Sequence, residues 1–127
     1  MSVQEAAEAV RVELQDASRG SVGRLQAALD AGDFPALMEI TKTMDQSLRK
    51  QIVGQAKYYW ADGNMGTQLS NNITFDLIGI NRNARPGQES ADGVQKYINE
   101  LRNDLEQILK YTEEAAAAAA ASGGEVS

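Results

Sequence analysis

The region from residue 94 to residue 112 constrains the fold of this chain more than any other feature of the sequence. Aliphatic side chains and one threonine recur there at spacings of 4, 3, 4, 3 and 4 residues, at Val94, Ile98, Leu101, Leu105, Ile108 and Thr112. This is the 3.5-residue period of a helical seam. Tyr97, Leu109 and Tyr111 widen the apolar face beyond a strict seam, which favours a helical bundle over a two-stranded rod.

The N-terminal third of the chain predicts two short helices or one bent helix. Ser2 and Glu5 have the spacing of a capping box in front of a helical stripe that ends near Ser18. Ser21 can cap a second piece, and Gly32 is well placed as its C-terminal stop.

A third helix is expected to begin at residues 33–35. Asp33 can accept a hydrogen bond from the first turn, and Pro35 stands where its missing N–H costs least. Helical spacing continues to about Trp60. The glycine-rich residues 62–66 then predict a turn.

Residues 67–81 fit two kinds of secondary structure. Leu69, Ile73, Leu77 and Ile80 have helical spacing, whereas residues 73–77 also alternate as a strand would. No other segment offers a partner strand within the chain, and a lone strand would leave its backbone groups unpaired. We therefore favour a helix; a strand here would pair with another molecule.

The last helix is expected after a loop at residues 81–87, with Ser90 or Asp92 as its cap. The alanine run from Ala115 to Ala121 has the highest helix propensity and can prolong this helix. We predict an all-α fold: a three- to four-helix bundle or an extended helical hairpin, with a long C-terminal helix that carries the seam. Residues 1–114 form a single helical domain in this interpretation, and residues 115–127 form an Ala-rich extension and a short tail.

The apolar content is low for a chain of this size. Val, Leu, Ile and Phe account for 26 of the 127 residues, about one in five, which is close to the level at which charged chains stop folding. A core this thin would be helped by sharing apolar surface with another chain. The composition thus favours an oligomer.

The chain has no Cys and no His, which excludes several chemistries. Disulfides, thiolate nucleophiles, Ser-His-Asp triads and histidine metal sites are all ruled out. No glycine-rich phosphate-binding motif is present. The side chains of Asp16, Asp30, Asp33 and Asp76 are expected on solvated helix faces. We predict a protein that is not an enzyme and that has no cofactor, metal or small-molecule substrate.

The net charge and the hydropathy of the chain limit the classes of partner and the locations that we expect. A net charge of −6 disfavours nucleic acid and anionic membranes as partners. Neither a signal peptide nor a transmembrane segment is recognisable, so we expect the chain in the cytoplasm or within an assembled particle.

Three basic residues, Lys42, Arg49 and Lys57, share one side of the third predicted helix. They are expected to face acidic neighbours such as Glu100 and Asp104 within the chain. The alternative for this basic stripe is an anion-binding site.

Tyr58, Tyr59 and Trp60 are the densest aromatic cluster. Three consecutive side chains span about 200° of a helix, so they cannot all face one core. They either cap the end of the bundle or contact another molecule. Tyr and Trp are common at binding hot spots. The predicted interface residues are Tyr59, Trp60, Ile98, Leu101, Leu105 and Ile108.

Together these features predict a non-enzymatic structural or assembly protein that acts through helix–helix association. It would form a homo- or hetero-oligomer, and a virion or particle component is one such role. The alternative is a small acidic adaptor or chaperone that binds one specific protein client through residues 58–80. In both cases the partner is a protein, either a further copy of the chain or a different one.

Overall fold

The structure is a computed structural model, and it describes residues 1–122. Its elements are all helical, and no strand occurs among these residues. The elements are α1 (Val3–Gln15), α2 (Ser21–Asp30), α3 (Phe34–Met44), the π-helical η1 (Asp45–Val53), α4 (Gly54–Ala56), the 3₁₀-helical η2 (Lys57–Tyr59), α5 (Gly63–Arg82) and α6 (Ala91–Ala121). The predicted all-α fold with a long C-terminal helix is confirmed.

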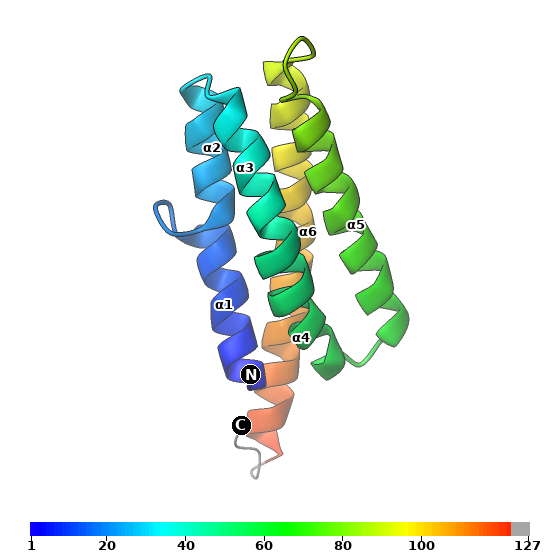
Figure 1. Cartoon of the computed structure of the whole chain (residues 1–127). Helices are drawn as coiled ribbons and strands as arrows, with labels where there is room; N and C mark the ends of the chain where they lie inside the picture. Colours follow the sequence, from blue (N-terminus) through cyan, green and yellow to red (C-terminus); the bar gives the residue numbers. More distant parts are fainter. Residues whose placement is uncertain (123–127) are drawn as a thin grey trace.

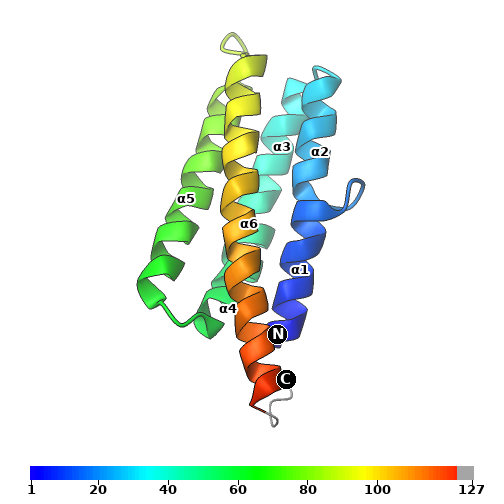
Figure 2. The ribbon, with the colours of Figure 1, turned by 180° about the vertical axis from the view of Figure 1, so that it is seen from behind.

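The helices lie side by side along one long direction (Figure 1). α1 and α2 follow one another on one side, and α3 continues through η1 and α4 as a single rod. From behind, α6 runs the length of the molecule with α5 on one side and α1 and α2 on the other (Figure 2). α6 contacts each of these three helices, so it is the central element of the packing.

Local capping explains where most helices begin. Ser2 Oγ accepts from the Glu5 backbone N–H at 3.0 Å, and Glu5 Oε1 accepts from the Ser2 N–H at 2.8 Å, which confirms the capping box. Asp33 and Ser90 cap α3 and α6 as expected. α2 differs, because Gly20 and not Ser21 is its N-cap residue.

The segment predicted as the third helix is helical from Phe34 to Tyr59, although its hydrogen-bond pattern changes three times. The chain passes from α-helix to π-helix at Asp45, returns to α-helix at Gly54 and ends in a 3₁₀ turn. Trp60 has extended dihedrals, which ends the helical segment at the predicted position.

The preference for a helix over residues 67–81 is confirmed by α5. The turn expected over residues 62–66 is wrong in extent, since α5 already begins at Gly63. Asp62 Oδ1 accepts hydrogen bonds from the backbone N–H groups of Asn64 and Met65. This cap stabilises the first turn of α5, although the segment is rich in glycine.

At the C-terminal end, residues 115–121 continue α6 without a break, as their helix propensity indicates. The predicted boundary between a domain and an extension at residue 115 stays a prediction. Residues 123–127 of the predicted tail lie outside the described residues.

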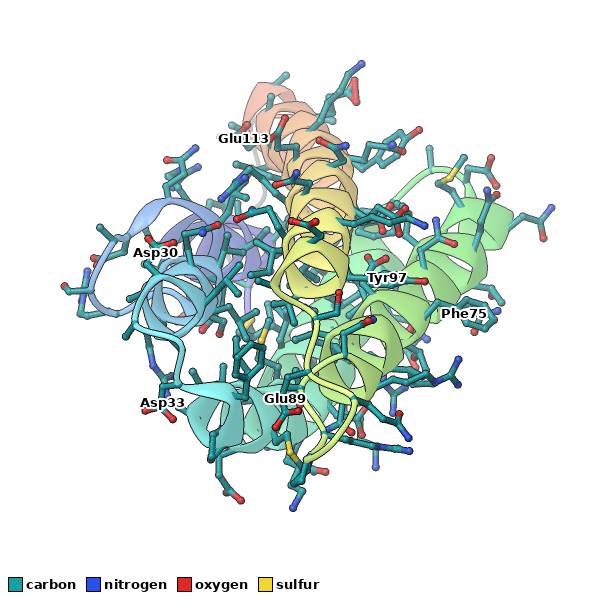
Figure 3. The ribbon with its side chains drawn as sticks, turned by 90° about the horizontal axis from the view of Figure 1, so that it is seen from above. Asp30, Asp33, Phe75, Glu89, Tyr97 and Glu113 are labelled. Atoms are coloured by element: carbon teal, nitrogen blue, oxygen red, sulfur yellow. The ribbon has the colours of Figure 1, made fainter. Side chains whose placement is uncertain are left out.

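A close contact between α5 and α6 depends on Gly79. A Cβ atom at this position would lie 2.4 Å from the ring of Tyr97 on α6. Figure 3 shows Tyr97 between the two helices. The ring therefore packs directly on the backbone of α5, which fixes how closely the two helices approach.

We expect Gly79→Ala to lower the free energy of unfolding by about 1–3 kcal/mol, because the Tyr97 ring must move away from the added methyl group. Urea unfolding followed by circular dichroism measures the change. Gly63→Ala is the matched control on the same helix, since a Cβ there meets nothing within 4 Å. Equal stability of Gly79→Ala and the wild type would show that this contact does not set the helix spacing.

Candidate protein-binding face

Exposed hydrophobic side chains gather in one part of the chain. Of the five large ones among the described residues, four lie between positions 58 and 78: Tyr58, Tyr59, Phe75 and Ile78, at 80%, 41%, 66% and 44% exposure. The other is Met1. This segment lies within residues 58–80, which the sequence indicated as a client-binding region.

The outer face of α5 carries two of these side chains. Six of its exposed residues recur at spacings of 4, 3, 4, 3 and 4, at Asn64, Gln68, Asn71, Phe75, Ile78 and Arg82. The opposite side of the helix is held in the core by Leu69, Ile73 and Ile80, each at most 1% exposed. This burial fixes the rotation of α5 and therefore turns Phe75 and Ile78 outward. Figure 3 shows Phe75 pointing away from the other helices.

α5 is also unusually poor in charge. Asp76 is the only ionisable residue in the stretch from residue 63 to residue 81, although Asp, Glu, Lys and Arg make up 24% of the whole chain. Depletion of charge together with exposed aromatic and aliphatic side chains is typical of the centre of a protein–protein interface. The outer face of α5 thus has the composition of a contact surface.

An acidic hollow of about 340 Å³ opens beside Phe75, between α5 and α6. It is lined by Asn72, Phe75, Asp76, Glu100, Asn103 and Asp104. Asn72 Nδ2 donates a hydrogen bond to Asp104 Oδ1 at 3.5 Å across the two helices. Three of the six lining residues carry carboxyl groups, and none is basic.

Asp76 is the unusual member of the acidic hollow. It is only 4% exposed, and its Oδ2 atom has no hydrogen-bond partner among the described residues. Burial, the hydrogen bond that protonated Asp76 can donate to the Asp104 carboxylate, and the charges of Asp104 and Glu100 raise the pKa of Asp76 to about 9. The Asp76 carboxyl group is therefore neutral at pH 7.

The expectation that Asp76 lies on a solvated helix face is wrong. Asp76 lies three residues after Ile73 and four before Ile80, so it belongs to the buried stripe of α5. This spacing could have revealed its position. What the sequence could not show is that α6 places two further carboxylates opposite it. By contrast, hydrogen bonds from Arg19 and Ser18 lower the pKa of the half-buried Asp16 carboxyl group to about 2.

Two of the three clustered aromatic residues have contacts within the chain. Trp60 is 8% exposed, and its Nε1–H donates to Thr112 Oγ1 on α6 at 3.0 Å, with the Tyr111 ring 5.8 Å from its own. The Tyr59 hydroxyl donates to the Met1 carbonyl oxygen. Trp60 therefore packs at one end of the helical assembly within the chain, and its assignment to an interface stays a prediction. Tyr58 is the most exposed of the three, at 80%, with Lys57 Nζ 6.0 Å from its ring centroid.

The four predicted interface residues on α6 are placed in the core. Ile98, Leu101, Leu105 and Ile108 have no exposed surface in the single chain. The helices α1, α2 and α5 of the same chain pack around α6, so intramolecular contacts already cover its seam. In this structure these four side chains offer no surface to a second molecule.

The basic stripe does not face Glu100 and Asp104 as expected. Arg49 Nε contacts Asp45 Oδ1 at 2.7 Å, and Lys42 Nζ lies 3.7 Å from Glu39 Oε1. These partners are three or four residues away on the same helical rod, where side chains meet most easily. Glu100 and Asp104 line the hollow beside α5 instead.

The described part of the chain, residues 1–122, contains no group of three or more acidic side chains placed to hold a metal ion. Within the same range, each helix is too short or too polar to cross a lipid bilayer. In comparisons with known protein families, curated proteins and solved structures, the chain matches none.

Proposed function

We propose that this chain is a non-enzymatic structural or assembly protein that acts through helix–helix association, with the outer face of α5 as its contact surface. Its helices would form one antiparallel bundle in the cytoplasm or within an assembled particle. The observation that carries the proposal is the exposure of Phe75 and Ile78 on a helix face with almost no charge. A homo- or hetero-oligomer would cover both side chains.

The geometry of α5 suits this role. Phe75 and Ile78 are three residues apart, so they form adjacent anchors for a groove or a helix of the partner. Burial of apolar surface contributes about 25 cal/mol per Å², and aromatic residues bury the largest areas. The amide side chains of Asn71 and Gln68 extend this surface with hydrogen-bonding groups that need no charged partner.

We expect Ile78→Asp to reduce association while the helical circular dichroism stays unchanged, because a charge would enter the contact surface but not the core. Sedimentation velocity across a concentration series measures the oligomer. Gln107→Asp is the control, since it adds the same charge at an exposed position of α6. An Ile78→Asp variant that associates as the wild type does would exclude the outer face of α5 as the contact surface.

The second candidate function is an adaptor or chaperone that holds one specific protein client through residues 58–80. It is favoured by Tyr58, which is 80% exposed in the same segment and lies outside the outer face of α5. Light scattering separates the two functions. A monomer whose mass does not change with concentration would favour the adaptor, whereas a concentration-dependent mass would favour self-assembly.

A further inference from the structure

The acidic hollow between α5 and α6 has the composition of a receptor for a cation. Its polar lining consists of the carboxyl groups of Asp76, Glu100 and Asp104 and the carboxamides of Asn72 and Asn103. The aromatic ring of Phe75 supplies its apolar wall, next to the contact surface on α5.

The buried carboxyl group of Asp76 indicates that the hollow lacks a donor. Buried polar atoms are almost always hydrogen-bonded, and an unsatisfied one costs about 1–3 kcal/mol. Asp76 is more than nine-tenths buried, yet Oδ2 finds no donor among residues 1–122. A proton on Asp76 neutralises only one of the three carboxyl groups that line the hollow. A cationic group with several N–H donors could satisfy them together.

We infer that the acidic hollow receives an arginine side chain of the protein partner that docks on the outer face of α5. This inference rests on the proposed function and specifies the chemistry of the partner. The arginine would place its guanidinium group against Asp76 and Asp104 and its planar surface along the Phe75 ring.

The shape and charge of the hollow favour a guanidinium over other cations. A guanidinium has five N–H donors in a fixed plane, remains charged at all relevant pH values and stacks on aromatic rings. A metal ion fits less well, because the described residues contain no group of three or more acidic side chains placed to hold one. The net charge of −6 further favours a partner that brings positive charge.

The arginine pocket would also give the interface its specificity. A partner that placed an apolar or acidic side chain over the hollow would leave Asp76 buried without a donor or would add repulsion between carboxylates. Phe75 and Ile78 by themselves would accept many apolar surfaces. The neighbouring carboxyl groups select the partners that carry an arginine beside their apolar anchors.

The test uses N-acetyl-arginine amide as the probe and the full chain labelled with ¹⁵N. We expect shift changes confined to residues 72–76 and 100–104, with an affinity on the order of millimolar, as suits a single side chain. N-acetyl-citrulline amide has nearly the same shape without the charge and should produce no such changes. Shift changes spread over the whole surface, or equal changes with citrulline, would overturn the inference.

Substitutions of residues that line the acidic hollow provide a second test of arginine binding. Asp76→Asn and, separately, Glu100→Gln should each weaken binding of the arginine probe by about tenfold. Glu100 is exposed, so its variant keeps the fold even if a change at Asp76 does not. Glu106→Gln removes the same charge from an exposed position of α6 outside the hollow and should leave binding unchanged. Wild-type affinity in both hollow variants would overturn the inference.

These measurements can be separated from the test of the proposed function. Ile78 does not line the hollow, so Ile78→Asp tests association without altering the lining of the arginine site. Loss of association in Ile78→Asp together with no specific binding of the arginine probe would reject only the arginine site. Specific binding of the probe with unchanged association in Ile78→Asp would reject the contact surface on α5.

Discussion

Asp76→Asn is expected to raise the free energy of unfolding by about 1–3 kcal/mol at pH 7.5. The wild-type chain must either bury a charge beside Asp104 and Glu100 or keep a proton that the unfolded chain has already released. Asparagine has a similar volume and no charge, and its amide can donate to Asp104. Stabilisation by a substitution in the core would be unusual, since most such changes destabilise.

The effect of Asp76→Asn should depend on pH in a defined direction. The pKa of Asp76 is raised from 3.8 in the unfolded chain to about 9 in the folded chain. At Asp76 the folded state thus holds more protons than the unfolded state between these values, so the contribution of Asp76 to wild-type stability is highest at low pH and falls as the pH rises through this window. The slope contributed by one group is at most about 1.4 kcal/mol per pH unit.

Urea unfolding at several pH values between 5 and 9 measures this dependence. We expect the gap between Asp76→Asn and the wild type to widen as the pH rises. Asp16 does not interfere, because its pKa is lowered to about 2 and its contribution changes only under more acidic conditions. Glu106→Gln, an exposed carboxylate of the same charge, should stay within about 0.5 kcal/mol of the wild type. Parallel pH curves for Asp76→Asn and the wild type would contradict the buried, protonated carboxyl group.

Leu101→Asp is expected to unfold the chain. Leu101 has no exposed surface and lies in the core face of α6. The substitution removes a buried leucine side chain, which costs about 2–5 kcal/mol, and places an unpaired carboxylate in the core. A small domain has only about 5–15 kcal/mol of stability, so little of the folded state should persist.

The melting temperature and the helical circular dichroism of Leu101→Asp test this expectation. Gln107→Asp adds the same charge to the exposed side of the same helix and should melt with the wild type. Comparing the two variants distinguishes the effect of a charge on the buried side of α6 from its effect on the exposed side. A Leu101→Asp variant with wild-type melting temperature would show that Leu101 is not part of the core.

The two roles inferred for Asp76 predict opposite effects from one substitution. Asp76→Asn should make the chain more stable and, if the hollow receives an arginine, weaken binding of that side chain. A residue retained only for folding would not combine these effects, whereas binding sites often reduce the stability of the protein that carries them. Measuring both quantities in the same variant separates a structural role from a binding role.

Local features of the sequence predicted the positions of most helices. The capping box at Ser2 and Glu5, the Asp33 cap, Gly32 with φ of 68° and the Ser90 cap all act within a few residues of the helix ends. Such interactions need no knowledge of the rest of the fold. The start of α5 was the main exception. The Asp62 side chain caps a first helical turn that contains Gly63 and Gly66, two residues that disfavour a helix.

The sequence also established that residues 94–112 have a buried apolar face, but not which molecule covers it. Apolar side chains at heptad spacing can be buried equally well against another chain or against helices of the same chain. The structure places Ile98, Leu101, Leu105 and Ile108 against α1, α2 and α5, so the thin core closes within one copy.

By itself, the sequence determined the helical periodicity, most of the caps and the absence of charge along α5, because each of these is set by neighbouring residues. Only the tertiary structure decided which side of α5 faces outward, with Phe75 and Ile78 exposed. It also brought Asp76 of α5 together with Asp104 and Glu100 of α6, residues 24 or more positions apart in the sequence. The pairing of helices depends on side-chain packing between distant segments, and the environment of Asp76 follows from that packing.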